Sequence, residues 1–206
     1  MIDLYTFGTS NGKRASVMLE EVGLQYSAHK VDLMSGAQFG EDFLKINPFA
    51  QIPAIVDPDG PGGQQVVMTQ SGAIMMYLAE KTGKFLPKTD ADRVGFWPAF
   101  ISAVSDVGMT VGSLMLTSRL ETEQPGAMDL FGGRARNYFK VWDDALGRSE
   151  YAGGDTLTVA DLALYPSYHR AAEVFPHTTK DFANLSAWAD KIGSREGVKR
   201  GMAVPA

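Results

Sequence analysis

The sequence predicts two domains: an α/β domain built on one mixed four-stranded sheet, followed by an all-α domain. Strand and helix patterns alternate over residues 1–85, in the order βαβ and then ββα. Proline and charge without apolar periodicity around residues 86–92 indicate a linker. Apolar residues beyond the linker recur at helical spacing, so we expect residues 86–206 to form the helical domain.

The first three elements have the pattern of a βαβ unit. Residues 2–7 alternate and are β-prone, and turn and cap residues follow at 8–12. Residues 14–22 carry a helical apolar stripe that ends at Gly23, and residues 26–33 form the next expected strand. A βαβ unit favours parallel strands joined by a right-handed crossover.

The following elements complete the sheet. We expect a short irregular helix at 39–46 and a buried strand, entered through proline, at 51–57. A proline- and glycine-rich loop at 58–63 leads to a strand at 65–68 and an apolar helix at 73–80. The resulting βαβ-ββα order is the thioredoxin-like arrangement.

Four helical segments are expected after the linker. Two long ones lie at about 90–120 and 129–146, and a shorter amphipathic one lies at 184–192. The remaining helix begins at Thr158, which caps it while Asp161 reaches back to the backbone N–H of the cap. Such a cap is worth about 1 kcal/mol to a helix.

Composition excludes several function classes. With 24 acidic against 19 basic residues, the net charge is −5, which argues against a nucleic-acid partner. Because the chain has no cysteine, a disulfide, a thiolate metal site and a cysteine nucleophile of its own are excluded. The three histidines are scattered along the sequence, so we expect no metal site.

The first residues, MIDLYTF, lack the basic and apolar regions of a signal peptide. We find no apolar run that approaches the ~18 residues of a membrane span. The expectation is therefore a cytoplasmic protein with no membrane partner.

The first candidate ligand site is the helix start at Gln70, Ser71 and Gly72. Small residues there leave backbone N–H groups and the positive end of the helix dipole facing outward. Such an end binds a carboxylate, with the Ser71 hydroxyl and the Gln70 amide as further contacts. The alternative is plain N-capping.

Two further polar clusters are candidates for the same site. A proline at the strand entry Gln51-Ile52-Pro53 leaves the backbone of Ile52 able to pair with an extended peptide, and a cis bond would fix that geometry. The alternative is a trans edge proline. The turn 9–12 follows the first strand, at the edge where open α/β sheets bind ligands, and its donors can stabilise an anion. The alternative there is helix capping by Ser10 or Asn11.

These clusters resemble those of the glutathione transferases, and the resemblance covers nearly the whole chain. It lies in the segments MIDLYTFGTSNG, LEEVGLQY, VDLMSGAQF, INPFAQIPAIVD, QSGAIMMYLAEKTG and YAGGDTLTVADLALYP, in the family's order and at its intervals. The chain is most similar to the bacterial Nu class, which carries a Thr-Pro-Asn-Gly turn. The resemblance implies a homodimeric enzyme with glutathione as co-substrate and a small electrophile or disulfide as second substrate.

The resemblance also implies a role for each cluster. Thr9 and Asn11 match the pair beside the glutathione sulfur, with Ser10 between them as a third donor. Ile52 matches the residue whose backbone pairs with the cysteinyl part, and Pro53 matches the cis proline. The matched glutathione-binding positions are Gln38, Gln51, Ile52, Pro53, Gln70, Ser71 and Arg134.

Within that set, Gln70 and Ser71 match the residues that hold the γ-glutamyl carboxylate, and Arg134 matches an arginine that reaches glutathione from the partner subunit. Three positions depart from the class. Ser10 stands where the class has proline, Gln70 replaces a glutamate, and Gln51 replaces a lysine that contacts the glycine carboxylate. Substrate preference therefore transfers less well than glutathione binding.

Thiolate stabilisation explains why these residue types are needed. A free thiol with a pKa of ~8.5 is mostly protonated at neutral pH. Lowering that pKa by about two units takes roughly 2.7 kcal/mol, which two or three hydrogen bonds to the charged sulfur can supply. Tyr5 is a rival donor, because some classes use a tyrosine near this position, but its place inside the first strand indicates packing against the sheet.

The helical domain offers apolar side chains for a second-substrate pocket. Methionine and aromatic residues at helical spacing are more often core than pocket. The candidates are Trp97, Phe100, Met109, Met115, Tyr165 and Tyr168.

Three functions stay open from the sequence. The Nu-class resemblance favours reduction of small disulfides by glutathione. The second is conjugation, or thiolytic cleavage of an ether or halide, by attack on an electrophilic carbon. The third is a non-catalytic glutathione-binding carrier, since function lies in the site and not in the fold.

Overall fold

The computed structural model describes residues 1–205, which divide into two compact units. Unit 1 contains Met1–Lys84 and the described residues from Arg195 onward, and unit 2 contains Phe85–Ser194. The expected boundary near residue 85 therefore coincides with the first crossing between units. The chain then returns to unit 1 at Arg195, whereas the expected helical domain ran to residue 206.

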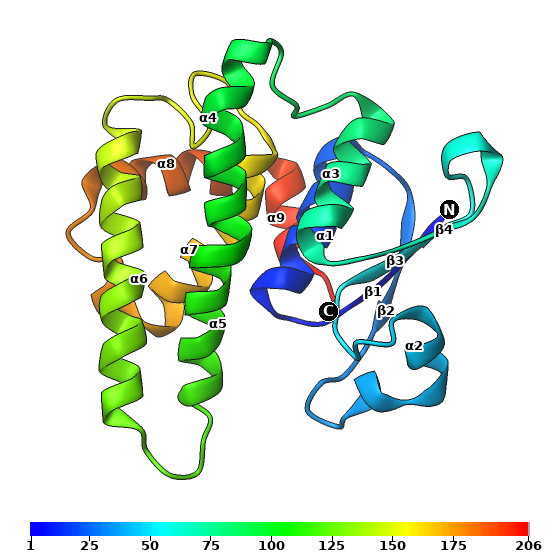
Figure 1. Ribbon diagram of the computed structural model, residues 1–206, viewed down its shortest axis with the longest axis horizontal. Helices are drawn as coiled ribbons and strands as arrows, with labels where there is room; N and C mark the ends of the chain where they lie inside the picture. The colour runs from blue at the N-terminus through cyan, green and yellow to red at the C-terminus, as the bar shows by residue number, and fades with distance from the viewer. Residues whose placement is uncertain (206) are drawn as a thin grey trace. The chain divides into compact units, whose positions relative to one another are not determined.

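Unit 1 holds the mixed four-stranded sheet that the sequence predicts, in the order β2-β1-β3-β4 (Figure 1). β1 is parallel to β2 and antiparallel to β3, and β3 is antiparallel to β4. The strands are β1 Ile2–Thr6, β2 Tyr26–Lys30, β3 Ala54–Asp57 and β4 Val66–Thr69. The helices are α1 Ser10–Val22, α2 Glu41–Ile46, α3 Ser71–Thr82 and α9 Glu196–Ala203, with single helical turns at Ala37–Phe39 and Pro61–Gly63.

Alternation along β1 divides the core of unit 1 between the two faces of the sheet. Leu4 is fully buried, while the next side chain, Tyr5, packs on the other face with Phe43 of α2 in a cluster that includes Ile52 and Ala54. Helices α1 and α3 lie side by side (Figure 1).

α1 begins four residues earlier than the sequence pattern predicts, and α3 begins two residues earlier. In both cases the first turn consists of polar or small residues, which add nothing to an apolar stripe but leave the helix start accessible. The polar first turns are therefore part of the helices and belong to the candidate site.

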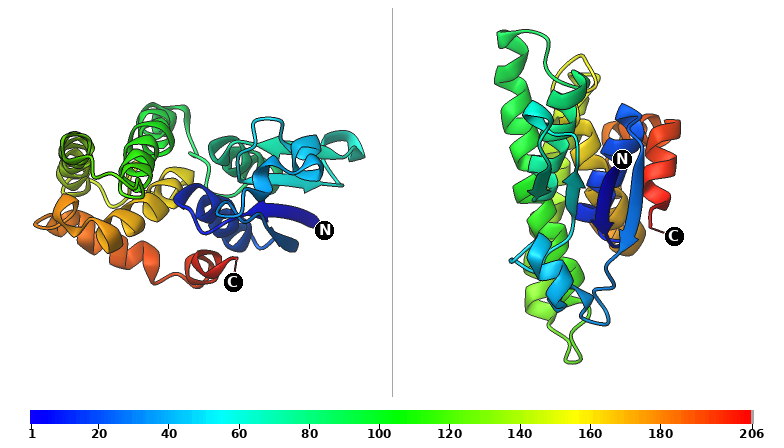
Figure 2. Two further views of the ribbon diagram at one scale, coloured as in Figure 1. Left: turned by 90° about the horizontal axis from the view of Figure 1, so that it is seen from below. Right: turned by 90° about the vertical axis from the view of Figure 1, so that its right-hand side faces the viewer.

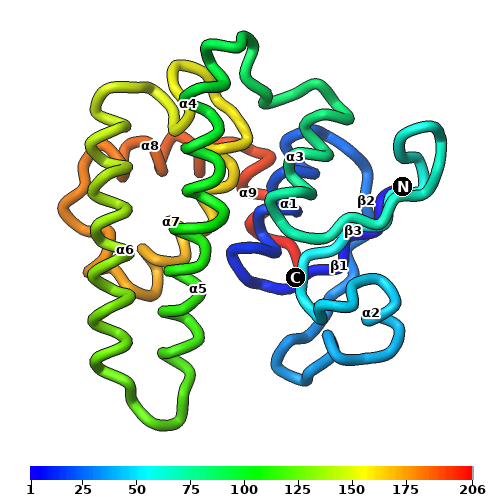
Figure 3. Tube along the Cα trace, viewed as in Figure 1, coloured from blue at the N-terminus to red at the C-terminus, as the bar shows by residue number. Residues whose placement is uncertain are grey.

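Helix α9, which the sequence pattern did not predict, runs along α1 within unit 1 (Figures 2 and 3). A Cβ on Gly201 would lie 2.4 Å from Cα of Val17, so only glycine permits this close approach. The Ser16 hydroxyl donates to the Gly201 carbonyl over 2.7 Å, and Lys13 Nζ donates to the Val204 carbonyl over 2.6 Å. The short helix was missed because its apolar residues are few.

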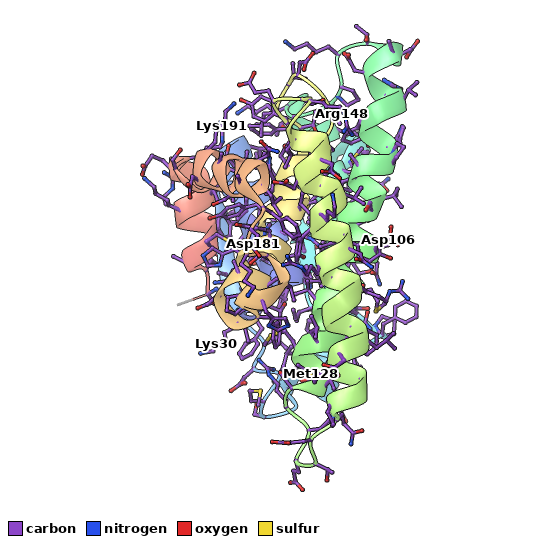
Figure 4. The ribbon with its side chains drawn as sticks, turned by 90° about the vertical axis from the view of Figure 1, so that its left-hand side faces the viewer. Lys30, Asp106, Met128, Arg148, Asp181 and Lys191 are labelled. Carbon is purple, nitrogen blue, oxygen red and sulfur yellow. The ribbon has the colours of Figure 1, made fainter. Side chains whose placement is uncertain are left out.

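Unit 2 is helical, as expected. It contains α4 Asp90–Ile101, a π-helical turn at Ser102–Val107, α5 Gly108–Thr117, α6 Pro125–Leu146, α7 Val159–Val174, a single turn at Pro176–Thr178 and α8 Ala183–Gly193. Figure 4 follows α6 from Met128 in its first turn to Arg148 just beyond its end.

The predicted capping box at the start of α7 is present and lies in the core of unit 2. Thr158 caps the helix, and the Asp161 carboxylate accepts from the Thr158 backbone N–H at 3.0 Å. The same carboxylate also accepts from the Ala152 N–H at 2.7 Å and from the Trp188 indole N–H at 2.9 Å. Asp161 therefore joins the start of α7 to a loop and to α8.

The expectation that no segment is apolar enough to cross a membrane is corrected by the helical run Asp90–Thr117. This run is 28 residues long, and by length and composition alone it is apolar enough to cross a membrane. Helices packed in the core of a soluble protein are often as long and as apolar, and both α4 and α5 pack on α7. The sequence argument failed because charged and small residues interrupt the run without ending the helix.

Candidate functional site

The register of the sheet brings the three polar clusters to one edge. Tyr5 on β1 is paired with Ala54 on β3, and Ala54 is paired with Thr69 on β4. The segments that follow Tyr5, precede Ala54 and follow Thr69 therefore leave the sheet side by side. These segments are the turn 9–12, the strand entry 51–53 and the helix start 70–72, as the sequence predicts.

Thr9 caps α1 and keeps a donor available. Its Oγ1 accepts from the Gly12 backbone N–H over 3.1 Å, so the cap is Thr9 and not Ser10 or Asn11. A hydroxyl that accepts one bond still has its own hydrogen to donate. Ser10 occupies the first position of the helix, and the Asn11 side chain is exposed.

Gly12 allows the start of α1 to sit directly on the end of β1. A Cβ at this position would lie 2.2 Å from the Phe7 carbonyl oxygen and 2.6 Å from Oγ1 of Thr6. Any larger residue would push the turn away from the sheet. The position of the thiolate-donor candidates thus depends on a glycine next to them.

Arg14 was not among the site residues that the sequence predicts, yet it connects two of them. Its Nη1 donates to Oδ1 of Asn11 over 2.7 Å and lies 3.5 Å from Oγ of Ser71, at the long limit of a hydrogen bond. The side chain is only 1% exposed, and burial lowers the pKa of Arg14 to about 10. It therefore stays charged at neutral pH. Only its helical spacing from Asn11, three residues on, could have indicated this contact.

The start of α3 is open, as a carboxylate site requires. No side chain caps the helix, so the N–H groups of its first turn have no intrahelical partner. Ser71 is nearly buried at the first position, and Gln70 before it is exposed. Gln70 has φ 67° and ψ 117°, a conformation that a residue with a side chain adopts at a cost of order 1–3 kcal/mol.

The Ile52–Pro53 peptide bond is cis, as the resemblance implies. Ile52 lies outside the paired register of β3, which begins at Ala54. The preceding loop is shaped by the buried Asn47, whose Nδ2 donates to the Gln51 carbonyl over 2.6 Å. Sequence reasoning passed over Asn47, because an asparagine after a short helix is typical of an ordinary turn.

Two other predicted residues lie in distinct surroundings. Gln38 lies in the single turn Ala37–Phe39, and among the described residues its Oε1 is buried without a hydrogen-bond partner. Tyr5, the rival donor, stacks on the His29 ring with 4.8 Å between centroids. Burial, followed by the nearby Asp3 carboxylate, raises the pKa of Tyr5. These contacts agree with the packing interpretation.

Arg134 lies on unit 2, exposed on α6, where its Nη2 contacts the Tyr138 hydroxyl at 3.0 Å. The apolar pocket candidates of unit 2 divide by exposure. Phe100 and Tyr165 are buried in the core, whereas Trp97 and Met109 are exposed. Met115 and Tyr168 are half-buried.

Within the described part of the chain, no group of three or more His, Cys, Asp or Glu residues is placed to hold a metal ion. A shallow hollow elsewhere on unit 1 is lined by Glu20, Glu21, Arg195 and Arg200. Its charges pair with one another, Arg195 with Glu21 and Arg200 with Glu20.

The chain belongs to the glutathione S-transferase family. The N-terminal domain of that family matches residues 2–80, and its C-terminal domain matches residues 106–201. The resemblance and the fold class that the sequence predicts are thus confirmed.

Two relatives and one solved structure are similar to the chain over most of its length. The chain is 36% identical over 168 residues to the disulfide-bond oxidoreductase YfcG of Escherichia coli K12, covering 81% of this chain and 78% of that protein. It is 31% identical over 222 residues to YghU, a disulfide-bond oxidoreductase of the same organism, covering 98% and 74%. A glutathione transferase family member from Pseudomonas fluorescens, solved with two glutathiones bound, superposes with a TM-score of 0.90 at 32% identity, covering 99% of this chain and 93% of that one.

Proposed function

We propose that this chain is a cytoplasmic glutathione-dependent enzyme that holds glutathione on unit 1 as the thiolate and uses it to reduce small disulfides. The convergence of the turn 9–12, the strand entry 51–53 and the helix start 70–72 at one edge of the sheet carries the proposal. Two relatives named disulfide-bond oxidoreductases, and similar structures that hold two glutathiones or a glutathione disulfide, support this choice of reaction.

Each end of glutathione has a matching group. The open start of α3, with Ser71 and Gln70, receives the γ-glutamyl carboxylate, because unpaired N–H groups and the helix dipole both favour an anion. The backbone of Ile52, outside the strand register and held by the cis Pro53, pairs with the cysteinyl residue. This pairing directs the sulfur towards the first turn of α1.

Two glutamine side chains supply the remaining polar contacts to glutathione. In this proposal, Gln38 and Gln51 contact the glycyl end. The buried Oε1 of Gln38 has no partner among the described residues, and a buried acceptor left unpaired is costly. A ligand N–H would relieve that cost.

At the thiolate, Thr9 Oγ1–H, the Asn11 amide and Ser10 are the donors. Hydrogen bonds to a charged acceptor are about twice as strong as neutral ones, so they favour the thiolate over the thiol. The thiolate attacks one sulfur of the disulfide, a mixed disulfide forms and the other sulfur leaves as a thiolate. A second glutathione thiolate then attacks the mixed disulfide, releasing glutathione disulfide and the second product thiol. The chain itself has no cysteine, so every sulfur in the exchange comes from a substrate.

The enzyme acts as a homodimer in this proposal, with dimer contacts and the second-substrate pocket built from unit 2 and Arg134 reaching the partner's glutathione. Val94, Trp97 and Ile101 are exposed at helical spacing on α4. An apolar helix face of this kind favours association with a second copy. Sedimentation of the wild type and of Ile101→Glu tests this, with a dimer expected only for the wild type.

Conjugation is the second candidate function, because other relatives carry transferase names, such as glutathione S-transferase F10 of Arabidopsis thaliana at 28% identity over 222 residues, covering 97% of this chain and 95% of that protein. The deciding experiment measures glutathione-dependent turnover of hydroxyethyl disulfide and of chlorodinitrobenzene, with calorimetric glutathione binding on the same sample. Fast disulfide reduction supports the proposal, and faster conjugation supports a transferase. Binding without turnover of either substrate indicates a carrier.

A further inference from the structure

Arg14 is a charged side chain in a place where charge is costly. It lies in the second turn of α1 and is 1% exposed. Removing a cation from water costs several kcal/mol unless good hydrogen bonds compensate. A methionine or leucine would fill the same space without that cost, so the contacts of the guanidinium deserve a functional explanation.

The contact with Asn11 determines which way the Asn11 amide faces. An amide has an accepting oxygen and a donating nitrogen, whereas a guanidinium only donates. Since Nη1 of Arg14 lies 2.7 Å from Oδ1 of Asn11, a flipped amide would set donor against donor. The donating NH₂ group must therefore point away from Arg14. Asn11 is exposed, so an NH₂ group that points away from Arg14 is accessible to a ligand.

The same guanidinium lies next to the other end of the candidate site. Nη1 is 3.5 Å from Oγ of Ser71, at the first position of α3. When the Ser71 oxygen accepts from a cation, its own hydrogen points elsewhere and can be donated to a carboxylate. One buried cation therefore orients a donor at the sulfur end and a donor at the carboxylate end.

We propose that Arg14 is a positioning residue for thiolate formation: without touching glutathione, it holds the Asn11 amide so that the NH₂ group donates to the glutathione sulfur. The inference rests on the proposed function, because it requires glutathione to bind at the edge of the sheet. The charge of Arg14 strengthens the donation from Asn11 to the sulfur, since a hydrogen bond to the amide oxygen polarises the amide and makes its N–H groups better donors.

The test is a pH titration of bound glutathione in Arg14→Gln, followed by the ultraviolet absorbance of the thiolate. The expected result is a rise of about one unit in the pKa of the bound thiol, the size of one lost charge-assisted hydrogen bond. Arg14→Lys keeps a cation and should restore part of the shift. Met18→Leu, a volume-conserving change in the fully buried face of the same helix, is the control and should leave the thiol pKa unchanged.

A double-mutant comparison separates positioning from a general effect on folding. In an Asn11→Ala background, Arg14→Gln should cause no further rise in the thiol pKa, because the amide through which it acts is gone. Partial unfolding lowers the amplitude of the titration but not its midpoint, so a less stable variant is still informative. An unchanged midpoint in Arg14→Gln, or an equal shift in both backgrounds, overturns the inference. A wild-type protein that binds no glutathione, or does not lower its thiol pKa, overturns the proposed function instead.

Discussion

Glu21 and Arg195, 174 residues apart in sequence, form a bidentate ion pair that joins α1 to α9 within unit 1. Arg195 Nη2 lies 2.6 Å from Oε2 of Glu21, and Nε lies 3.1 Å from both carboxylate oxygens. Oε1 also accepts from the Val198 backbone N–H at 3.1 Å, so Glu21 caps the start of α9. The Glu21 side chain is only 4% exposed and that of Arg195 is 38% exposed, so solvent screens this pair less than a fully exposed one.

We expect Gly201→Ala to destabilise unit 1 by about 1–3 kcal/mol, because the new methyl group would overlap the backbone of α1. Its Cβ would lie 2.4 Å from Cα of Val17. Urea unfolding measures the effect. The matched control is Gly126→Ala in α6, where a Cβ would meet nothing within 4 Å, and it should be neutral or slightly stabilising. Equal stability of the two variants would contradict the close packing of α9 on α1.

Thr9→Ala and Asn11→Ala should each shift the pH profile of turnover to higher pH, with a smaller effect on glutathione affinity. Each change removes a donor to the thiolate, so more of the bound thiol stays protonated at neutral pH. Thr9→Ala should also lose about 1 kcal/mol of stability with its cap, whereas Thr9→Ser keeps cap and donor and serves as the control. If both alanine variants retain the wild-type pH profile, the assignment of the thiolate donors is wrong.

Ser10→Pro should fold normally and gain about 0.4–1 kcal/mol, because proline restricts the unfolded chain and fits the first position of a helix. The preceding residue, Thr9, already has φ −104° and ψ 162°, the extended conformation that proline requires of its neighbour. Turnover should be nearly unchanged if Ser10 is a spacer. A large loss of rate in a stably folded variant would identify the Ser10 hydroxyl as a catalytic donor.

Stability at acidic pH should depend on Asp57. Burial raises the pKa of its carboxyl, but hydrogen bonds from Tyr77, Lys81 and the Asp59 N–H and the charge of Lys81 outweigh burial and hold the pKa below its usual value. A lowered carboxyl pKa adds stability above the unfolded value of about 3.9, and this stability is lost as pH falls through the folded value. Asp57→Asn should therefore flatten the loss of stability below about pH 4 in urea titrations. Asp59→Asn, at an 88% exposed carboxylate, is the control and should keep the wild-type slope.

Local patterns were sufficient to predict most of the fold. Strand alternation, glycine helix ends and the Thr158–Asp161 capping box each depend on residues close in sequence, and the sheet and α7 were found as expected. The start of α1 was placed too late, because the polar residues of its first turn carry no apolar periodicity. α9 was missed because its stability comes from contacts with α1, about 180 residues earlier.

Some residues of the candidate site could likewise be predicted from the sequence, and others could not. Thr9, Ile52 and Ser71 could be predicted, because turns, proline-entered strands and helix starts are visible in short segments. Arg14 and Asn47 could not, since their roles follow from burial behind the site. A sequence shows that an arginine is present in a helix, but not that its charged end lies beneath two polar turns.

The return of the chain to unit 1 at Arg195 has a consequence for biosynthesis. Domains made first commonly fold first as the chain leaves the ribosome. Here Glu21, Ser16 and Val17 emerge early, whereas their partners on α9 are made about 180 residues later. Unit 1 therefore stays incomplete along one side of α1 until α9 has been made, and in that interval it most needs protection from aggregation.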